Sequence, residues 1–266
     1  MKNIVKTIPL LLLLACGGND LDPNLVWSDE FEKNGLPDPK KWAYDVGDHG
    51  WGNNELQYYT KKTLANARIE NGNMIIEAHQ DSTFSKAYTS ARLVTKGNAS
   101  WQYGYIEIKA KLPSGSGTWP AIWMLPEESK YGGWPKSGEI DIMEHVGYDQ
   151  GTVHGTVHTE AFNHRIGTQM GATKSVPSCS DEFHIYAIDW QEQKIDFYID
   201  GVLYHTFENT KKNSAEWPFD MPFHLIMNIA VGGDWGGSKG IAADIWPQRM
   251  EIGYVRVYRE KPEEVK

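Results

Sequence analysis

Three acidic side chains stand close together near the middle of the chain: Glu139, Asp141 and Glu144 in the run Glu-Ile-Asp-Ile-Met-Glu. The alternation of acids with isoleucines predicts a short, half-buried strand in which Glu139 and Asp141 share one face. Glu144 is an odd number of steps away, so in a regular strand it would face the other side. One extra residue at Met143, a β-bulge, would return Glu144 to the face of the other two acids. We therefore expect three carboxylates on one face.

Crowded carboxylates of this kind suit glycoside hydrolysis. A retaining mechanism places two carboxyl groups about 5–5.5 Å apart, one as nucleophile and the other as proton donor. Close like charges also separate the pKa values of the groups, so that one stays ionised while another keeps its proton. The alternatives are a solvated strand edge, a helix and a calcium loop. No Lys or Arg lies between Gly138 and Gly147, the glycines disfavour a helix, and calcium sites favour loops rich in Asn and backbone carbonyls.

The same run, preceded by Gly138 and followed by His-Val-Gly, resembles the signature of glycoside hydrolase family 16. The form with the inserted Met143 is similar to the laminarinase branch, the endo-β-1,3-glucanases. The resemblance implies that Glu139 is the nucleophile, that Asp141 assists it and that Glu144 is the general acid/base. It also implies a β-jelly-roll sandwich of two curved antiparallel sheets with a concave substrate cleft. The expected activity is retaining endo-hydrolysis of β-1,3-glucosidic bonds in laminarin-type glucans.

Short strand-like runs separated by turn signals follow one another along the chain, with almost no helical pattern and no fixed-period repeat. Asn71-Gly72 and Asp200-Gly201 predict hairpin turns. The pattern predicts an all-β sandwich made by one domain, residues 25–260, followed by a polar tail at 261–266.

Amide and tryptophan side chains at several positions suit a sugar ligand, because amides bond to hydroxyls and aromatic rings stack on pyranose faces. From the residues alone, an ordinary turn or core position explains many of them equally well. Trp119 and Trp123 share a strand face, and Trp235 stands in a glycine-rich turn, where we expect it at the cleft rim. The family resemblance favours substrate binding, and Arg92 would otherwise be a surface residue with a buried stem. The expected substrate contacts are Asn53, Arg92, Trp119, Trp123, Trp134, His158 and Trp235.

The histidines raise the possibility of a metal site. His154, His158 and His164 are near neighbours in sequence, but no cysteine or carboxylate motif completes a zinc site, so we expect packed or cleft-lining histidines. The resemblance implies that His158 lies near the nucleophile, and it implies a structural calcium site remote from catalysis. Gly253 stands where the family has a calcium-binding aspartate, which leaves Glu30 and backbone carbonyls as weak candidates. We expect no cofactor to be required.

The N-terminus predicts an export signal. Residues 1–16 combine a basic start with a short apolar run, and Leu-Leu-Ala-Cys resembles a bacterial lipobox ending at Cys16. An ordinary signal peptide with an incidental cysteine is the alternative. Residues 17–24 are expected to form a flexible tether. We expect an exported bacterial lipoprotein of the cell envelope, at the outer membrane or cell surface, whose lipid anchor is its only membrane contact.

Charge and cysteine content restrict the partners. The formal charge of −9 and the lack of a basic run disfavour nucleic acid. If Cys16 is lipidated, Cys179 has no disulfide partner and is expected to be a packed residue. We expect a monomer whose partner is a β-glucan polysaccharide. Two alternatives stay open: a mixed-linkage β-1,3-1,4-glucanase, and a glycan-binding surface lipoprotein that does not cleave. Sulfated galactans are disfavoured, because the stretches expected to form the cleft carry few cations besides Arg92.

Overall fold

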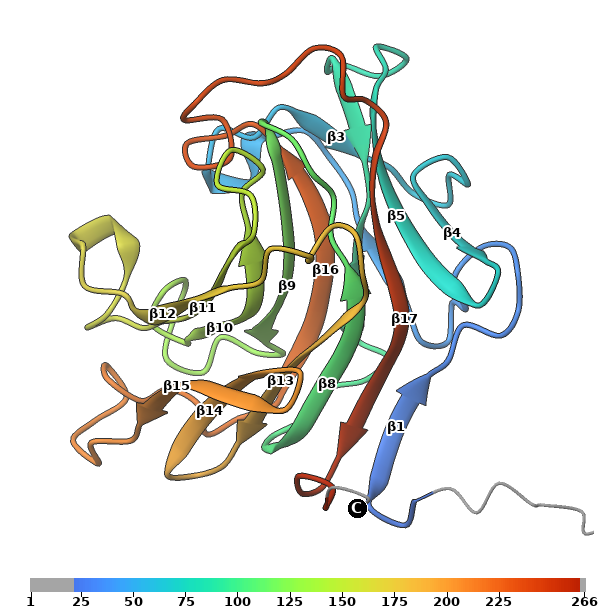
Figure 1. Ribbon diagram of the computed structural model, residues 1–266. Coiled ribbons are helices and arrows are strands. Elements are labelled where there is room, and N and C mark those ends of the chain that lie inside the picture. The colour runs from blue at the N-terminus through green and yellow to red at the C-terminus, as the bar shows by residue number, and fades with distance from the viewer. Residues whose placement is uncertain (1–21, 264–266) are drawn as a thin grey trace, which may run out of the picture.

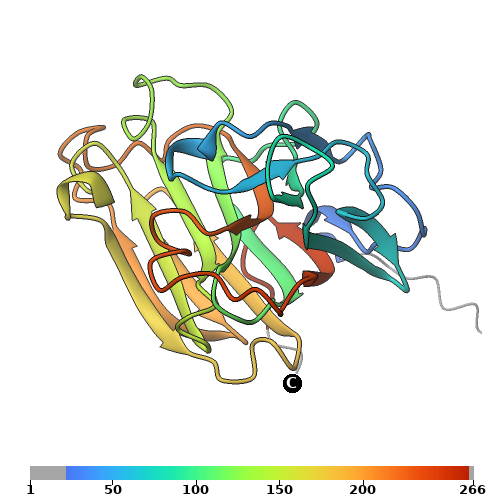
Figure 2. The same cartoon turned by 90° about the horizontal axis from the view of Figure 1, so that it is seen from above.

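Two β-sheets lie face to face in the computed structural model, which describes residues 22–263 (Figures 1 and 2). In this part of the chain, one sheet has seven strands, in the order β12 (Met170–Ser175), β11 (Thr152–His158), β10 (Glu139–His145), β9 (Thr118–Pro126), β16 (Phe223–Val231), β7 (Arg92–Val94) and β2 (Ala43–Asp45). The other has ten, in the order β15 (Val202–Glu208), β14 (Lys194–Ile199), β13 (His184–Trp190), β8 (Gly104–Lys111), β17 (Gln248–Tyr258), β5 (Asn73–Gln80), β6 (Tyr88–Ser90) and β3 (Gln57–Tyr59), with β1 (Leu25–Asp29) on β17 and β4 (Ala67–Glu70) on β5. Two short 3-10 turns, η1 (Gly50–Gly52) and η2 (His164–Ile166), complete these elements.

Strand alternation divides each sheet into a core face and an outer face. In β9, Trp119 and Trp123 line a cavity on the outer face, while Ile122 and Met124 are fully buried between the sheets. The named strand pairs are antiparallel except β3 with β6, and the long central strands are curved (Figure 1). Burying one face of each sheet against the other removes the apolar surface from water. The predicted all-β sandwich is confirmed.

Both predicted hairpins are present. Asn71-Gly72 joins β4 to β5 with φ values of 54° and 77°, and Asp200-Gly201 joins β14 to β15 with φ values of 50° and 75°. Positive φ at both central positions is the geometry of a two-residue turn whose twist matches that of its strands.

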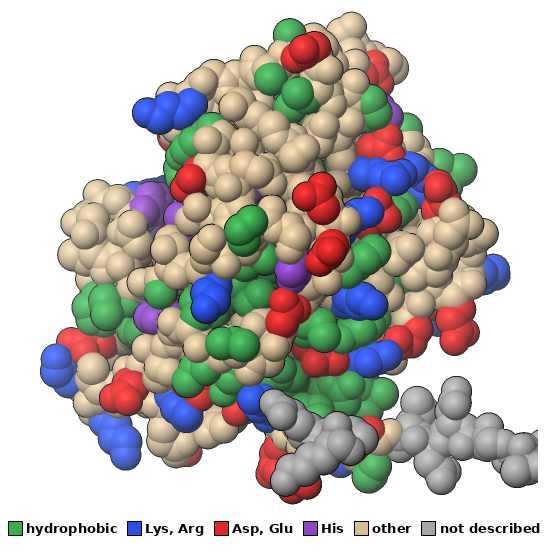
Figure 3. All heavy atoms as spheres, in the orientation of Figure 1, with side chains coloured by type: hydrophobic (Ala, Val, Ile, Leu, Met, Phe, Trp, Pro, Cys, Tyr) green, Lys and Arg blue, Asp and Glu red, His purple; other side chains and the backbone are tan. Residues whose placement is uncertain are grey.

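Acidic and basic side chains are interspersed over the face seen in Figure 3. Cys179 is fully buried in the core, as expected for a packed residue. Among residues 22–263, no helix is long and apolar enough to cross a membrane. The predicted signal peptide with Cys16, residues 17–21 of the predicted tether and residues 264–266 of the tail lie outside the described residues.

Candidate active site

A bulge in β10 brings the three acids to one face. On β11, Asp141 pairs with Thr156 and Glu144 with His154, so Ile142 and Met143 together stand opposite the single residue between those two partners. Both of these apolar side chains are buried in the core between the sheets. Because two consecutive residues face inward, the alternation resumes with Glu144 facing outward, beside the other acids. The predicted bulge is confirmed.

The acids line a cavity of about 320 Å³ on the outer face of the seven-stranded sheet. Its wall includes five of the seven expected substrate contacts: Asn53, Arg92, Trp119, Trp123 and Trp134. The sheet supplies the floor from β9, β10, β16 and β7, and loops that contain Asn53, Trp134 and Arg165 supply the walls. The cavity therefore joins segments from both halves of the chain.

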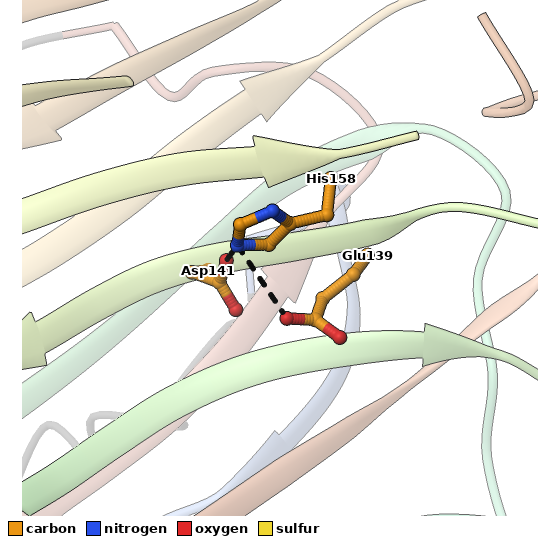
Figure 4. Close-up of side chains that lie close together, drawn as sticks. All are labelled: Glu139, Asp141 and His158. Atoms are coloured by element: carbon orange, nitrogen blue, oxygen red, sulfur yellow. Dashed lines mark ion pairs between the residues drawn. The ribbon is translucent and has the colours of Figure 1, made fainter. Parts of the chain in front are cut away.

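Glu139 accepts a hydrogen bond from Trp134 and lies beside His158 and Asp141. Trp134 donates its Nε1–H to Glu139 Oε2 at 2.7 Å, and His158 Nε2 lies 3.9 Å from Oε1 and 3.3 Å from Asp141 Oδ2 (Figure 4). Burial raises the pKa of Glu139 to about 7, although the Trp134 and Asp141 hydrogen bonds and the Arg92 charge act in the opposite direction. These donors favour the ionised form that a nucleophile needs.

Asp141 is the most deeply buried of the three acids. It is 2% exposed, and burial raises its pKa well above the usual range, with further contributions from the charges of Glu139 and Glu144. The hydrogen bond between the Asp141 and Glu139 carboxyls raises the pKa of Asp141 and lowers that of Glu139. A protonated Asp141 can therefore donate to Glu139 and hold it in its ionised form.

Glu144 has its own tryptophan donor. Trp119 donates its Nε1–H to Glu144 Oε1 at 3.0 Å. Burial raises the pKa of Glu144 to about 7, the Trp119 hydrogen bond lowers it, and the charge of Glu139 raises it. A carboxyl with a pKa near neutrality is suited to give and take protons.

His158 brings a third potential metal ligand to this cluster. Ligand atoms of Glu139, Asp141 and His158 lie within 4.8 Å of one another. Burial lowers the pKa of His158 to about 4, so its ring is neutral. Its Nδ1 is buried and makes no hydrogen bond within residues 22–263, whereas a metal-bound histidine almost always donates its other ring N–H to a partner. The cluster fits a histidine whose Nε2–H faces the acids better than it fits a metal ion.

Arg92 is fixed in the cavity wall. Its guanidinium lies between Trp51, at 4.7 Å, and Trp123, at 4.6 Å, and it forms an ion pair with Asp45 at 3.0 Å. Only 9% of the residue is exposed, so the structure places it as part of a stacked wall and not as a free surface cation.

A polar network that lines part of the cavity was missed by the sequence analysis. Glu55 accepts hydrogen bonds from Asn53, at 3.2 Å, and from Tyr59, at 3.3 Å. Asn228 donates to Tyr59 at 3.0 Å and accepts from Trp123 at 2.7 Å. Asn228 is an isolated amide within the apolar run of β16, and that interruption was the available signal.

Three of the residues expected to contact substrate make contacts that the sequence did not predict. The Trp134 ring carries Arg165 over its face, at 4.5 Å, in addition to its bond to Glu139. Trp235 is not part of the cavity wall, and its ring meets the Trp119 ring edge-on. His158 is likewise not part of the wall, and it contacts the acids from the neighbouring strand β11, where it stands opposite Glu139. The sequence carried no signal for Arg165.

The residues at the weak calcium candidate do not fit a cation site. Both carboxylate oxygens of Glu30 accept hydrogen bonds from Arg256 at 2.9 Å. Gly253 offers no side-chain ligand and lies against the stem of Lys109. Both candidate positions therefore lie beside a basic side chain, whereas calcium needs anionic or carbonyl oxygens around it.

Comparison with known proteins gives concordant results. Residues 52–256 match the description Glycosyl hydrolases family 16. A β-glucanase of Rhodothermus marinus is 57% identical, over 97% of this chain and 96% of that protein. The X-ray structure of the laminarinase from Rhodothermus marinus superposes with a TM-score of 0.88 at 56% identity, covering 90% of this chain and 98% of that one. A non-specific endo-β-1,3(4)-glucanase co-crystallised with 1,3-β-D-cellotriosyl-glucose has a TM-score of 0.86 at 46% identity, covering 89% and 94%.

Proposed function

Because this chain belongs to glycosyl hydrolases family 16, we propose that it is a retaining endo-β-glucanase that hydrolyses β-1,3-glucosidic bonds in laminarin-type glucans. The chain is a glycoside hydrolase, and its two sheets form the jelly roll expected from the sequence. The observation that carries the proposal is the bulge that places Glu139, Asp141 and Glu144 in one aromatic-walled cavity.

In the first step, an ionised Glu139 oxygen attacks the anomeric carbon while the bond from that carbon to the leaving oxygen breaks. Protonated Glu144 gives its proton to the departing oxygen. Asp141 keeps its own proton and directs it at Glu139, which orients the nucleophile. The product is a covalent glycosyl ester on Glu139 with inverted configuration.

In the second step, Glu144 changes its role from acid to base. Esterification removes the negative charge of Glu139, which had helped to raise the pKa of Glu144. The pKa of Glu144 therefore falls, and its carboxylate takes a proton from water. The water attacks the same anomeric carbon, the ester bond breaks, and the second inversion gives net retention.

The test is a reducing-sugar assay on laminarin with two active-site variants. We expect Glu139→Ala and Glu144→Ala to abolish turnover without loss of fold, whereas Glu182→Ala, at an exposed glutamate, serves as the control. Azide should rescue Glu139→Ala and give a glycosyl azide of inverted configuration. Normal turnover by Glu144→Ala, together with no azide product from Glu139→Ala, would refute the assignment.

Mixed-linkage β-1,3-1,4-glucan is the second candidate substrate, because one structural relative is described as a non-specific endo-β-1,3(4)-glucanase. A product profile on laminarin and on barley-type glucan distinguishes the two substrates. A relative from Penaeus monodon is described as a β-1,3-glucan-binding protein, but binding alone has no use for three crowded acids.

We also propose that the protein is a monomer exported as a lipoprotein, anchored to the envelope through Cys16, and that it needs no metal ion. Labelled palmitate should be incorporated by the wild type but not by Cys16→Ser. Treatment with a chelator should leave both the melting temperature and the activity unchanged.

A further inference from the structure

Trp235 lies outside the cavity wall but contacts two residues that flank Glu144. Its ring meets Trp119 edge-on, with centroids 5.4 Å apart and planes at 77°, and it meets His154 edge-on at 4.9 Å and 88°. Trp119 donates a hydrogen bond to Glu144, and His154 stands directly opposite Glu144 on β11. Opposed residues of antiparallel strands project to the same face. Trp235 therefore packs against both neighbours of Glu144: the hydrogen-bond donor Trp119 and the cross-strand residue His154.

The glycine-rich turn that carries Trp235 is packed directly against Trp119. A Cβ atom on Gly236 would lie 2.8 Å from Trp119 Cβ and 2.7 Å from the Gly232 carbonyl, so no side chain fits there. Asp234 donates its backbone N–H to the Asn53 carbonyl at 2.8 Å, which ties the turn to the neighbouring loop. The hydrogen bond fixes the turn in place, and glycine lets its backbone pack directly against Trp119. The turn therefore supports the Trp119 indole closely.

We propose that Trp235 is a positioning residue for leaving-group protonation: it holds the Trp119 indole against Glu144 and keeps water from the outer side of that carboxyl. The inference rests on the proposed glycosidase function. It assigns the turn to the proton-donating half of the reaction, whereas the sequence suggested a rim contact with sugar.

The electrostatics around Glu144 agree with this role. Burial is the largest cause of its raised pKa, and Trp119, which Trp235 contacts, is hydrogen-bonded to the carboxyl. Admitting water through a truncated Trp235 would lower the pKa of Glu144 and move the alkaline limb of the pH profile to lower pH. Other titratable and charged groups line the cavity or lie on the same face of β10 and β11: Glu139, Asp141, Glu55, Arg92, Arg165, His49, His164, His154 and His158.

Two substrates with the same sugar and different leaving groups isolate the proton transfer. Dinitrophenolate leaves without protonation, whereas phenolate needs the acid. We expect Trp235→Ala to lower kcat/KM about 10- to 100-fold for phenyl β-laminaribioside, part of the 10²–10⁴-fold that general acid catalysis contributes. For 2,4-dinitrophenyl β-laminaribioside we expect little change, and Trp235→Phe should keep most of the wild-type ratio between the two substrates.

Trp51→Ala is the matched control, because Trp51 lines the cavity and stacks on Arg92 but does not contact Glu144. It should lower kcat/KM for both substrates by a similar factor and leave the alkaline limb in place. The same behaviour in a folded Trp235→Ala variant would overturn the inference while the glycosidase function stands. A wild type that cleaves neither laminarin nor these glycosides would instead overturn the proposed function itself.

Discussion

Replacing Glu144 with Gln is expected to stabilise the fold above neutral pH while it removes the acid/base. The folded protein raises the pKa of this carboxyl from 4.5 to about 7, chiefly by burial. A raised carboxyl pKa means that the folded state binds the proton more tightly than the unfolded state does. The carboxyl therefore takes no folding free energy from the wild type below pH 4.5. The loss of folding free energy grows as the pH rises from 4.5 to about 7, and it is fully present above that value.

The magnitude follows from that pair of pKa values. At about 1.4 kcal/mol for each tenfold change in proton affinity, the change from 4.5 to about 7 corresponds to about 3 kcal/mol at pH 8. This is an upper limit, because Glu144 is only half-buried and water in the open cavity screens its charge. The amide of the Glu144→Gln variant keeps an oxygen that can accept the Trp119 hydrogen bond, and it carries no charge. For a domain of this size, about 3 kcal/mol corresponds to a melting temperature higher by roughly 6–12 °C.

Thermal unfolding of the wild type and Glu144→Gln at pH 4, 6 and 8 tests this reasoning. The gain should be absent at pH 4 and largest at pH 8. Glu182→Gln, at an exposed glutamate with no ion pair among the described residues, removes the same formal charge and should change little at any pH. An equal gain at pH 4 and pH 8, or a loss of stability at pH 8, would show that burial of this carboxylate is not costly.

Three further outcomes test the geometry. Trp134→Phe removes the hydrogen-bond donor to Glu139, so the acidic limb of the kcat/KM pH profile should move to higher pH. Activity should fall roughly tenfold or more, which is the value of one hydrogen bond to a charged group. An acidic limb that does not move would contradict this role of Trp134. Deleting Met143 removes the bulge but leaves an even, four-residue spacing between Glu139 and Glu144, so a regular strand keeps both acids on the outer face; activity should survive, and the melting temperature should fall because a buried methionine side chain is lost. A folded deletion variant without activity would show that the acids need the bulge itself and not only a shared face. Asp45→Asn removes the ion pair to Arg92 and should raise KM a few-fold with kcat unchanged. If steady-state kinetics show a fall in kcat instead, the ion pair acts in the chemical step.

Local patterns in the sequence determined the strands, the hairpins and the face of the acids. The apolar–acidic alternation and the one-residue offset of Glu144 both follow from the two-residue period of a strand, so parity alone predicts the bulge. Asn71-Gly72 and Asp200-Gly201 specify their turns because few other residue pairs tolerate positive φ at both positions. Periodicity and backbone preference act over a few residues and are visible without a structure.

Apart from His158, which the family resemblance already placed near the nucleophile, tertiary structure decided which side chains meet the acids. Trp119 donates to Glu144 across 25 positions of the chain, and Asn228 donates to Tyr59 across 169. The sequence suggested Trp119 as a sugar platform, but the structure adds an indole N–H that supports proton transfer. Such contacts depend on strand order and on the closeness of separate loops, and no local propensity encodes either one. The pKa of each acid has the same origin, because burial is a property of the packed sheets and not of the run of letters that contains the acids.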